Sequence, residues 1–178
     1  MTSLAIRSAA LQPNSDPQKF IAFPIANHSI AVPLGNVLRV LRHTPDDSNE
    51  ELHRMGLLPI GRHVIRALNL RQWLNADATS QSSETQSSET QSFIIIVGIP
   101  QQEPFGIWTE GLPDVVELSS DVWRSLSPSV STSSSFLELI SHTAVIPQKK
   151  GHKTIFLLDI AQALNARAPE AATLSPAF

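Results

Sequence analysis

The sequence predicts an all-β fold of the kind seen in small barrels and sandwiches. Its apolar residues stand mostly in short runs rich in isoleucine, valine and phenylalanine, which strands favour. Turn-forming residues separate these runs at intervals of about 8–12 residues, the spacing typical of all-β domains. Helical patterns are confined to short segments. With 178 residues, the chain suits one domain of ordinary size, with room for two lobes.

The first strands form a predicted hairpin. Phe20–Ile25 and Ile30–Leu34 are apolar runs joined by four turn-forming residues, which is a hairpin pattern. Val37–Leu41 fits either a helical turn or a third strand, and its second half favours the strand. The stretch Gly56–Leu74 then places Gly61-Arg62 between two apolar runs, which predicts a tight turn feeding a buried strand.

A polar insert follows this stretch. Residues 75–92 are almost purely polar and contain the pentapeptide Gln-Ser-Ser-Glu-Thr twice in succession. Such a segment cannot bury enough apolar surface to offset the entropy of ordering it, so we expect a disordered loop. Residues 1–17 are expected to be a flexible arm and residues 169–178 a flexible tail. The folded domain is therefore predicted to span residues 18–168.

The second half of the chain continues the β pattern. Phe93–Val97 is a run of β-branched and aromatic residues, which predicts a central strand buried on both faces. Phe105–Thr109 is its expected hairpin partner, and Val115–Leu118 alternates as a further strand. Thr143–Ile146 and Thr154–Leu158 flank a lysine-containing turn and predict a last hairpin.

Two short helical segments are expected near the later strands. Ser119 or Ser120 can cap a helical turn that runs to Trp123, because their hydroxyls can accept free amides of the first turn. Asp159 is expected to cap a final helix, Ile160–Arg167, which Pro169 follows.

The charge and amino-acid composition of the chain argue against several kinds of partner and location. The net charge of −3 and the pI near 6.0 give no positive field to attract nucleic acid, which we therefore do not expect as a partner. Cysteine is absent, which excludes disulfides and thiolate catalysis and suits a reducing cytosol. No segment approaches the roughly 20 apolar residues of a membrane span, and Arg7 interrupts the apolar start. We expect a cytoplasmic protein without membrane insertion.

No catalytic, metal or cofactor motif is found. The six histidines form no i, i+4 pair, and there is no phosphate-binding glycine loop or nucleophile elbow. The carboxylates of residues 43–54 lack the turn glycine of a calcium loop, so a solvated loop or short helix is expected there. These carboxylates are Asp46, Asp47, Glu50 and Glu51. We predict no enzyme activity, no metal and no cofactor.

The order of these elements resembles the CheW family of chemotaxis coupling proteins, and also the regulatory domain of CheA-type histidine kinases. The resemblance spans roughly residues 18–166. Its motif Gly-x-x-Asn-Leu-Arg-Gly-x-x-x-Pro-x-x-Asp-Leu-Arg falls on Gly56 through Arg71. The segments similar to other family elements are Phe20–Ile25, Ile30–Leu34, Val37–Val40, Phe105–Leu118 and Ile155–Leu164.

The chain also departs from the family pattern. The motif arginine falls on Gly61, and Arg62 comes one place late. The motif proline is Arg66, the motif aspartate is Asn69, and the aspartate of the later hairpin is Glu110.

The resemblance implies an all-β fold of two interlocked, SH3-like five-stranded β-barrel lobes with short helices, including a C-terminal one. It implies a non-catalytic adaptor in a chemotaxis-type two-component pathway, recruited to receptor arrays at the inner face of the membrane. Its partners would be a CheA-like histidine kinase and the cytoplasmic tip of a methyl-accepting receptor, the latter in the groove between the lobes. Partner-binding residues carry over to Val37, Gly61 and Arg62, although Val37 also suits ordinary packing.

Two alternatives remain at this point. A degenerate regulator would bind only one of the two partners, because the altered turn has lost the other. A small enzyme with an unrecognised site would use Glu110, Asp114 and His63.

Overall fold

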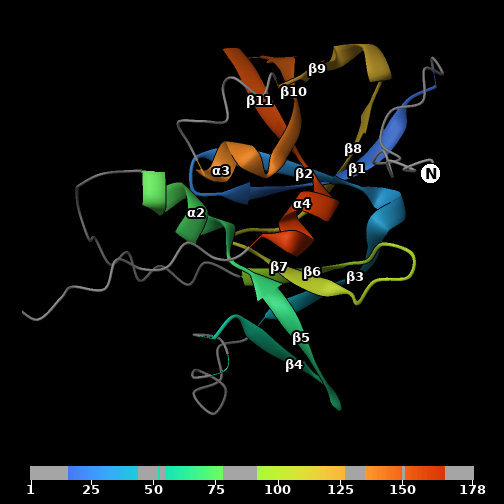
Figure 1. Ribbon diagram of the computed structural model, residues 1–178. Helices are drawn as coiled ribbons and strands as arrows, with labels where there is room; N and C mark the ends of the chain where they lie inside the picture. The colour runs from blue at the N-terminus through green and yellow to red at the C-terminus, as the bar shows by residue number, and fades with distance from the viewer. Residues whose placement is uncertain are drawn as a thin grey trace, which may run out of the picture.

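The all-β prediction is confirmed. The computed structural model describes residues 16–43, 52, 55–77, 92–126, 135–149 and 151–166. Two curled sheets and a few short helices make up this part of the chain (Figure 1). Nearly all of the expected arm, insert and tail lies outside the described residues, as do Asp46, Asp47, Glu50 and Glu51.

The first sheet has six strands in the order β8-β1-β2-β11-β10-β9. Its predicted β1–β2 hairpin is confirmed, but Ile25 pairs with His28, so the turn has two residues rather than the expected four. The parallel pairing of β2 with β11 places the N-terminal hairpin beside the C-terminal one. The three-residue β9 is an addition to the five strands expected per lobe. The strands are β1 (Gln18–Ile25), β2 (His28–Pro33), β8 (Asp114–Leu118), β9 (Trp123–Ser125), β10 (Ile140–Gln148) and β11 (Gly151–Leu158).

The second sheet has five strands in the order β3-β6-β7-β5-β4. As predicted, β6 lies inside the sheet, and all residues from Phe93 to Val97 are buried. The ambiguous segment that starts at Val37 is a strand over its whole length. The strands are β3 (Val37–His43), β4 (Leu57–Ile60), β5 (His63–Leu68), β6 (Ser92–Val97) and β7 (Phe105–Thr109).

Short helices join the strands. The Asp159 carboxylate accepts the backbone N–H of Gln162 at 3.0 Å, so the last helix begins as predicted. The cap expected from Ser119 is absent, because its hydroxyl donates to the Asp121 carboxylate rather than accepting a backbone amide. The helical segments are α2 (Leu70–Asp77), α3 (Ser135–Glu138), α4 (Ile160–Asn165), and the 3-10 turns η1 (Leu34–Asn36) and η3 (Ser120–Val122).

Helix α2 corrects two predictions. The stretch Gly56–Leu74, expected to run into a buried strand, ends instead in this helix, where Leu70 and Trp73 are buried together three residues apart, as helical spacing requires. The helix runs to Asp77, so the first residues of the expected polar insert are helical.

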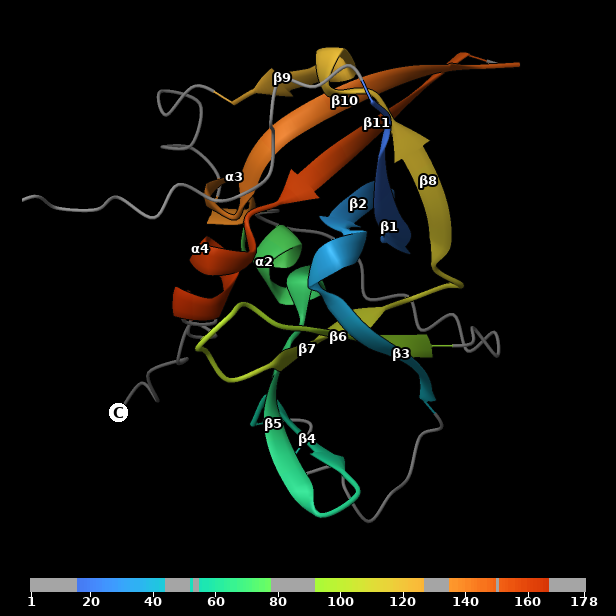
Figure 2. The ribbon, with the colours of Figure 1, turned by 90° about the vertical axis from the view of Figure 1, so that its right-hand side faces the viewer.

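The main apolar core lies between the two sheets, and helices α2, α3 and α4 contribute residues to it (Figure 2). Each curled sheet also has a smaller apolar cluster on its concave face. The cluster of the first sheet surrounds Phe20, and that of the second surrounds Ile94. Each sheet is therefore a half-barrel with its own interior, and the two share one core. Principal residues of the shared core are Phe23, Ile30, Trp73, Ile95, Ile107, Phe136 and Ile160.

The six-stranded sheet is closed at one end by Trp123. Strands β8 and β9 are opposite edges of the sheet, but only residues 119–122 separate them in the chain. The sheet must curl until these edges meet. Trp123 then packs on Phe20, with ring centroids 5.1 Å apart, and its side chain is 5% exposed.

Trp123→Ala is expected to lower the free energy of unfolding by about 3–5 kcal/mol, because it leaves a large cavity at the closed end. Urea unfolding followed by circular dichroism measures this change. Val115→Ala, on β8 of the same sheet but 53% exposed, should change stability by less than about 0.5 kcal/mol. Equal effects of the two substitutions would contradict the assigned closure.

Candidate partner-binding site

The Gly61-Arg62 turn joins β4 to β5 at the end of a projecting hairpin (Figure 2). Ile60 pairs with His63, so the loop has two residues. Gly61 has φ +60°, and Arg62 is not among the described residues with positive φ. A positive φ at the first loop residue alone is the pattern of a type II′ turn, which places glycine there. The predicted tight turn is confirmed.

Strand β5 is not the buried strand that the sequence predicts. Leu68 is its only buried residue, and Val64 is 56% exposed. The reason is its position: β5 and the edge strand β4 extend beyond the rest of the sheet, so one face of the hairpin meets solvent. The other face contributes Leu58 and Ile65 to the cluster around Ile94.

Arg62 presents a cation at the tip of this hairpin. Its side chain is exposed and has no hydrogen bond or ion pair with any described residue. The order Gly-Arg, which reverses the family's Arg-Gly, matches the turn type, because the residue with positive φ comes first. The turn therefore still carries an arginine, but at its second loop position instead of its first.

Val37 lies at the other edge of the same sheet. It begins β3, is half-buried, and packs against the main core, which agrees with its alternative interpretation as a packing residue. Its neighbours Leu38 and Val40 are 64% and 40% exposed. The register shifts between Val37 and Arg39, and such a bulge turns the intervening Leu38 out of the regular alternation.

The structure does not bring Val37 and Arg62 together. Strands β3 and β4 are the two edges of the five-stranded sheet. Four strand spacings, about 19 Å along the sheet, separate them. The predicted site residues therefore belong to two surfaces: the exposed β3 edge around Leu38 and Val40, and the hairpin tip at Arg62.

Arg66 fixes the hairpin to the last helix. Its guanidinium donates to the carbonyl oxygens of Leu164 at 2.9 Å and Ala166 at 3.2 Å. The last carbonyls of a helix lack partners within it and carry a partial negative charge, so a cation stabilises this end. In the sequence, Arg66 is recognisable only as a departure from the family proline. No local sequence pattern indicates its contacts with Leu164 and Ala166, which lie about 100 residues away in the chain.

A groove of about 660 Å³ runs beside the hairpin. The loop before β7 and the end of α4 form its other walls. The lining is mainly apolar, and His63, Arg66 and Glu103 supply polar groups. Its apolar side chains include Ile60, Val64, Ile65, Ile96 and Leu164.

The three residues of the enzyme alternative are not gathered into one site. The Glu110 carboxylate accepts hydrogen bonds from Nη1 of Arg71 at 2.7 Å and from the backbone N–H of Ala26 at 2.8 Å. These bonds connect helix α2 to the β1–β2 turn. Asp114 is exposed on β8 of the first sheet, whereas His63 is exposed on β5 of the second.

Two side chains away from these surfaces have shifted pKa values. Burial lowers the pKa of His142 on β10, against a smaller opposing effect of the Asp159 carboxylate. The hydrogen bond from Ser119 lowers the pKa of Asp121. Among the described residues, no three histidine or acidic side chains are grouped to hold a metal ion. None of the helices in the described part is long and apolar enough to cross a membrane.

Comparisons with known proteins agree with this architecture. The profile of the CheW-like domain matches residues 19–168. The crystal structure of the scaffolding protein TtCheW from Thermoanaerobacter tengcongensis superimposes with a TM-score of 0.57 at 17% sequence identity, over 88% of this chain and 98% of that one. At this identity the likeness establishes the fold, two β-barrel lobes. A search of the curated proteins finds no match.

Arg66→Ala is expected to lower the free energy of unfolding by about 1 kcal/mol, since exposed hydrogen bonds contribute modestly. Amide hydrogen exchange should accelerate most in α4. Arg62→Ala is the matched control, because it removes an arginine of the same hairpin that makes no hydrogen bond or ion pair with any described residue. If both variants exchange alike in α4, Arg66 does not hold the helix.

Gly61→Ala is expected to destabilise the protein by about 1–2 kcal/mol, because a Cβ is strained at positive φ. Gly35→Ala is a matched control: a Cβ at either glycine would meet nothing within 4 Å, but only Gly61 has positive φ. Thermal unfolding of the two variants measures the difference. Equal melting temperatures would show that the turn does not need its glycine, and that arginine could be placed at 61 without strain.

Proposed function

The chain belongs to the CheW-like domain family, and on that premise we propose that it is a non-catalytic adaptor of a chemotaxis-type two-component pathway. It couples the cytoplasmic tip of a methyl-accepting receptor to a CheA-like histidine kinase. The observation that carries the proposal is the separation of two exposed surfaces on one sheet. An adaptor must hold two partners at once, and surfaces at opposite edges let both bind without overlap.

The kinase binds the hairpin tip. Arg62 is exposed there on a two-residue turn, and Arg66 restrains the hairpin from behind. The short turn fixes the backbone from which this cation extends, which favours a specific contact with a polar or acidic patch. The adjacent apolar groove supplies surface that a partner can bury.

The receptor tip binds the β3 edge. Leu38 and Val40 are exposed apolar side chains on this strand, beside the half-buried Val37. Exposed apolar residues grouped on one edge are suited to a protein partner. The protein itself is cytoplasmic, and binding to receptors recruits it to arrays at the inner face of the membrane.

A regulator that binds only one partner is the second candidate. The observation that favours it is the glycine-first turn, which places Arg62 one position later than the family's arginine. If the kinase requires the family's turn, this chain would keep the receptor surface alone.

Size-exclusion chromatography with the cognate kinase's regulatory domain and a receptor cytoplasmic fragment tests both candidates. The adaptor should enter one complex with both partners. Arg62→Ala should weaken kinase binding by roughly tenfold or more and leave receptor binding unchanged, and Leu38→Asp should do the reverse.

Lys149→Ala and Val145→Asp are the matched controls, since both residues are exposed on the C-terminal hairpin of the other sheet. Binding of the receptor fragment alone would establish the single-partner regulator. Failure to bind either partner would contradict both candidates.

A further inference from the structure

A hollow of about 740 Å³ lies at the open end of the six-stranded sheet, the end away from Trp123. Asp114, the first residue of β8, lies at this end, whereas Leu118, the last residue of β8, belongs with Trp123 to the cluster around Phe20. The hollow is within the size range of small-molecule sites, and the mouths of β-barrels are common places for them.

The strand register explains why space remains here. Strand β11 pairs with β10 from Gly151 onward, but its pairing with β2 begins only at Ile155, opposite Ser29. Residues 152–154 of β11 therefore have a strand neighbour on one side only. On the facing strands the lining side chains include the small Ala22 and Ser29, which leave the gap unfilled.

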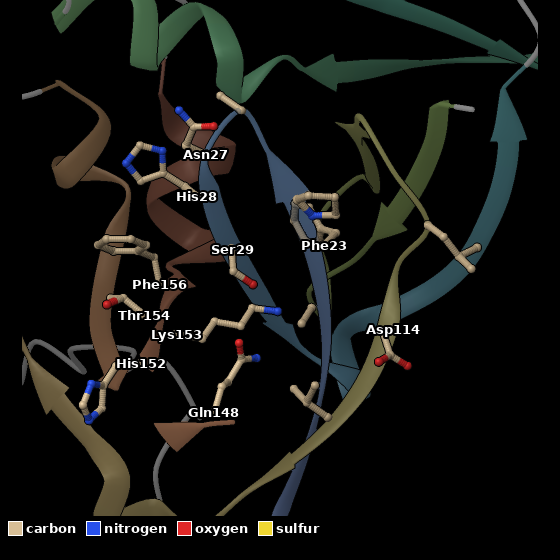
Figure 3. A pocket seen from close by; sticks show the side chains of 15 residues that line it. Phe23, Asn27, His28, Ser29, Asp114, Gln148, His152, Lys153, Thr154 and Phe156 are labelled. Carbon is tan, nitrogen blue, oxygen red and sulfur yellow. The ribbon is translucent and has the colours of Figure 1, made fainter. Parts of the chain in front are cut away.

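Polar side chains converge on this hollow (Figure 3). Lys153 extends into it from β11, and Gln148 and Ser29 point toward the same space. Asp114 lies across the hollow on β8. Other titratable side chains in the lining are His28 and His152.

These polar groups lack internal partners. Lys153 and Ser29 are half-buried, yet neither side chain makes a hydrogen bond or ion pair with any described residue, and the same is true of the Gln148 amide. Polar groups partly withdrawn from water, such as Lys153 and Ser29, are normally hydrogen-bonded, and their convergence with the exposed Gln148 amide on one hollow favours a ligand there.

We propose that this hollow binds a small organic monoanion. The ammonium group of Lys153 binds the ligand's carboxylate, with the Ser29 hydroxyl and the Gln148 amide as further donors. The apolar body of the ligand lies against Ala22 and Val116. Asp114 on the opposite side disfavours a second negative charge. The site is on the other sheet from the proposed partner surfaces, so this proposal does not depend on the adaptor function.

Nuclear magnetic resonance titration of the full chain with benzoate tests the proposal. Benzylamine and benzyl alcohol are matched probes, because they keep the ring and replace the anion by a cation or a neutral group. Benzoate should give saturable shifts at Ser29, Gln148 and Lys153, with a dissociation constant of roughly 1–10 mM, as expected for a small fragment. The two other probes should not saturate.

Lys153→Met should weaken benzoate binding by about tenfold or more, because the charge-assisted contact is lost. Lys149→Met, at the exposed tip of the same hairpin, should bind benzoate as the unaltered protein does. The amide spectrum of each variant shows whether it is folded. Equal shifts with all three probes, or unchanged binding in Lys153→Met, would overturn the proposal, as would the absence of saturable shifts with benzoate.

Discussion

The shared core between the two sheets is the interaction on which the rest of the molecule depends. Phe23 and Ile30 from the first sheet and Ile95 and Ile107 from the second are almost fully buried in it. Because the sheets bury their facing surfaces against each other and against the helices, little apolar surface remains for partners there. The exposed apolar residues that the proposed partner surfaces use lie on β3 of the second sheet and on its β4–β5 hairpin.

This constraint also explains how much the sequence could predict. Local patterns identify β1, β2, β6, β7 and the last hairpin, because alternation and β-branched runs depend on neighbouring residues. The Asp159 cap is equally local. Strand β5 was expected to be buried, since its apolar residues resemble those of a core strand. Its exposure arises because β5 pairs with β7 only from Arg66 onward and otherwise extends with β4 beyond the rest of the sheet, which only the topology determines.

The candidate site was only partly predictable for the same reason. The Gly61-Arg62 turn follows from its residues, and so does the presence of a cation there. The contacts from Arg66 to Leu164 and Ala166 join segments about 100 residues apart, and no sequence pattern reports them. The position of Val37 opposite that turn depends on strand order. Whether Val37, Gly61 and Arg62 contact partners stays a prediction.

The central claim is that this chain couples a receptor to a kinase through two surfaces of one sheet. The most direct measurement is kinase autophosphorylation with receptor fragments assembled on vesicles, with and without the chain. The account predicts that receptor control of the kinase requires the chain, and that Arg62→Ala and Leu38→Asp each abolish this control. Equal receptor control with the chain omitted would contradict it.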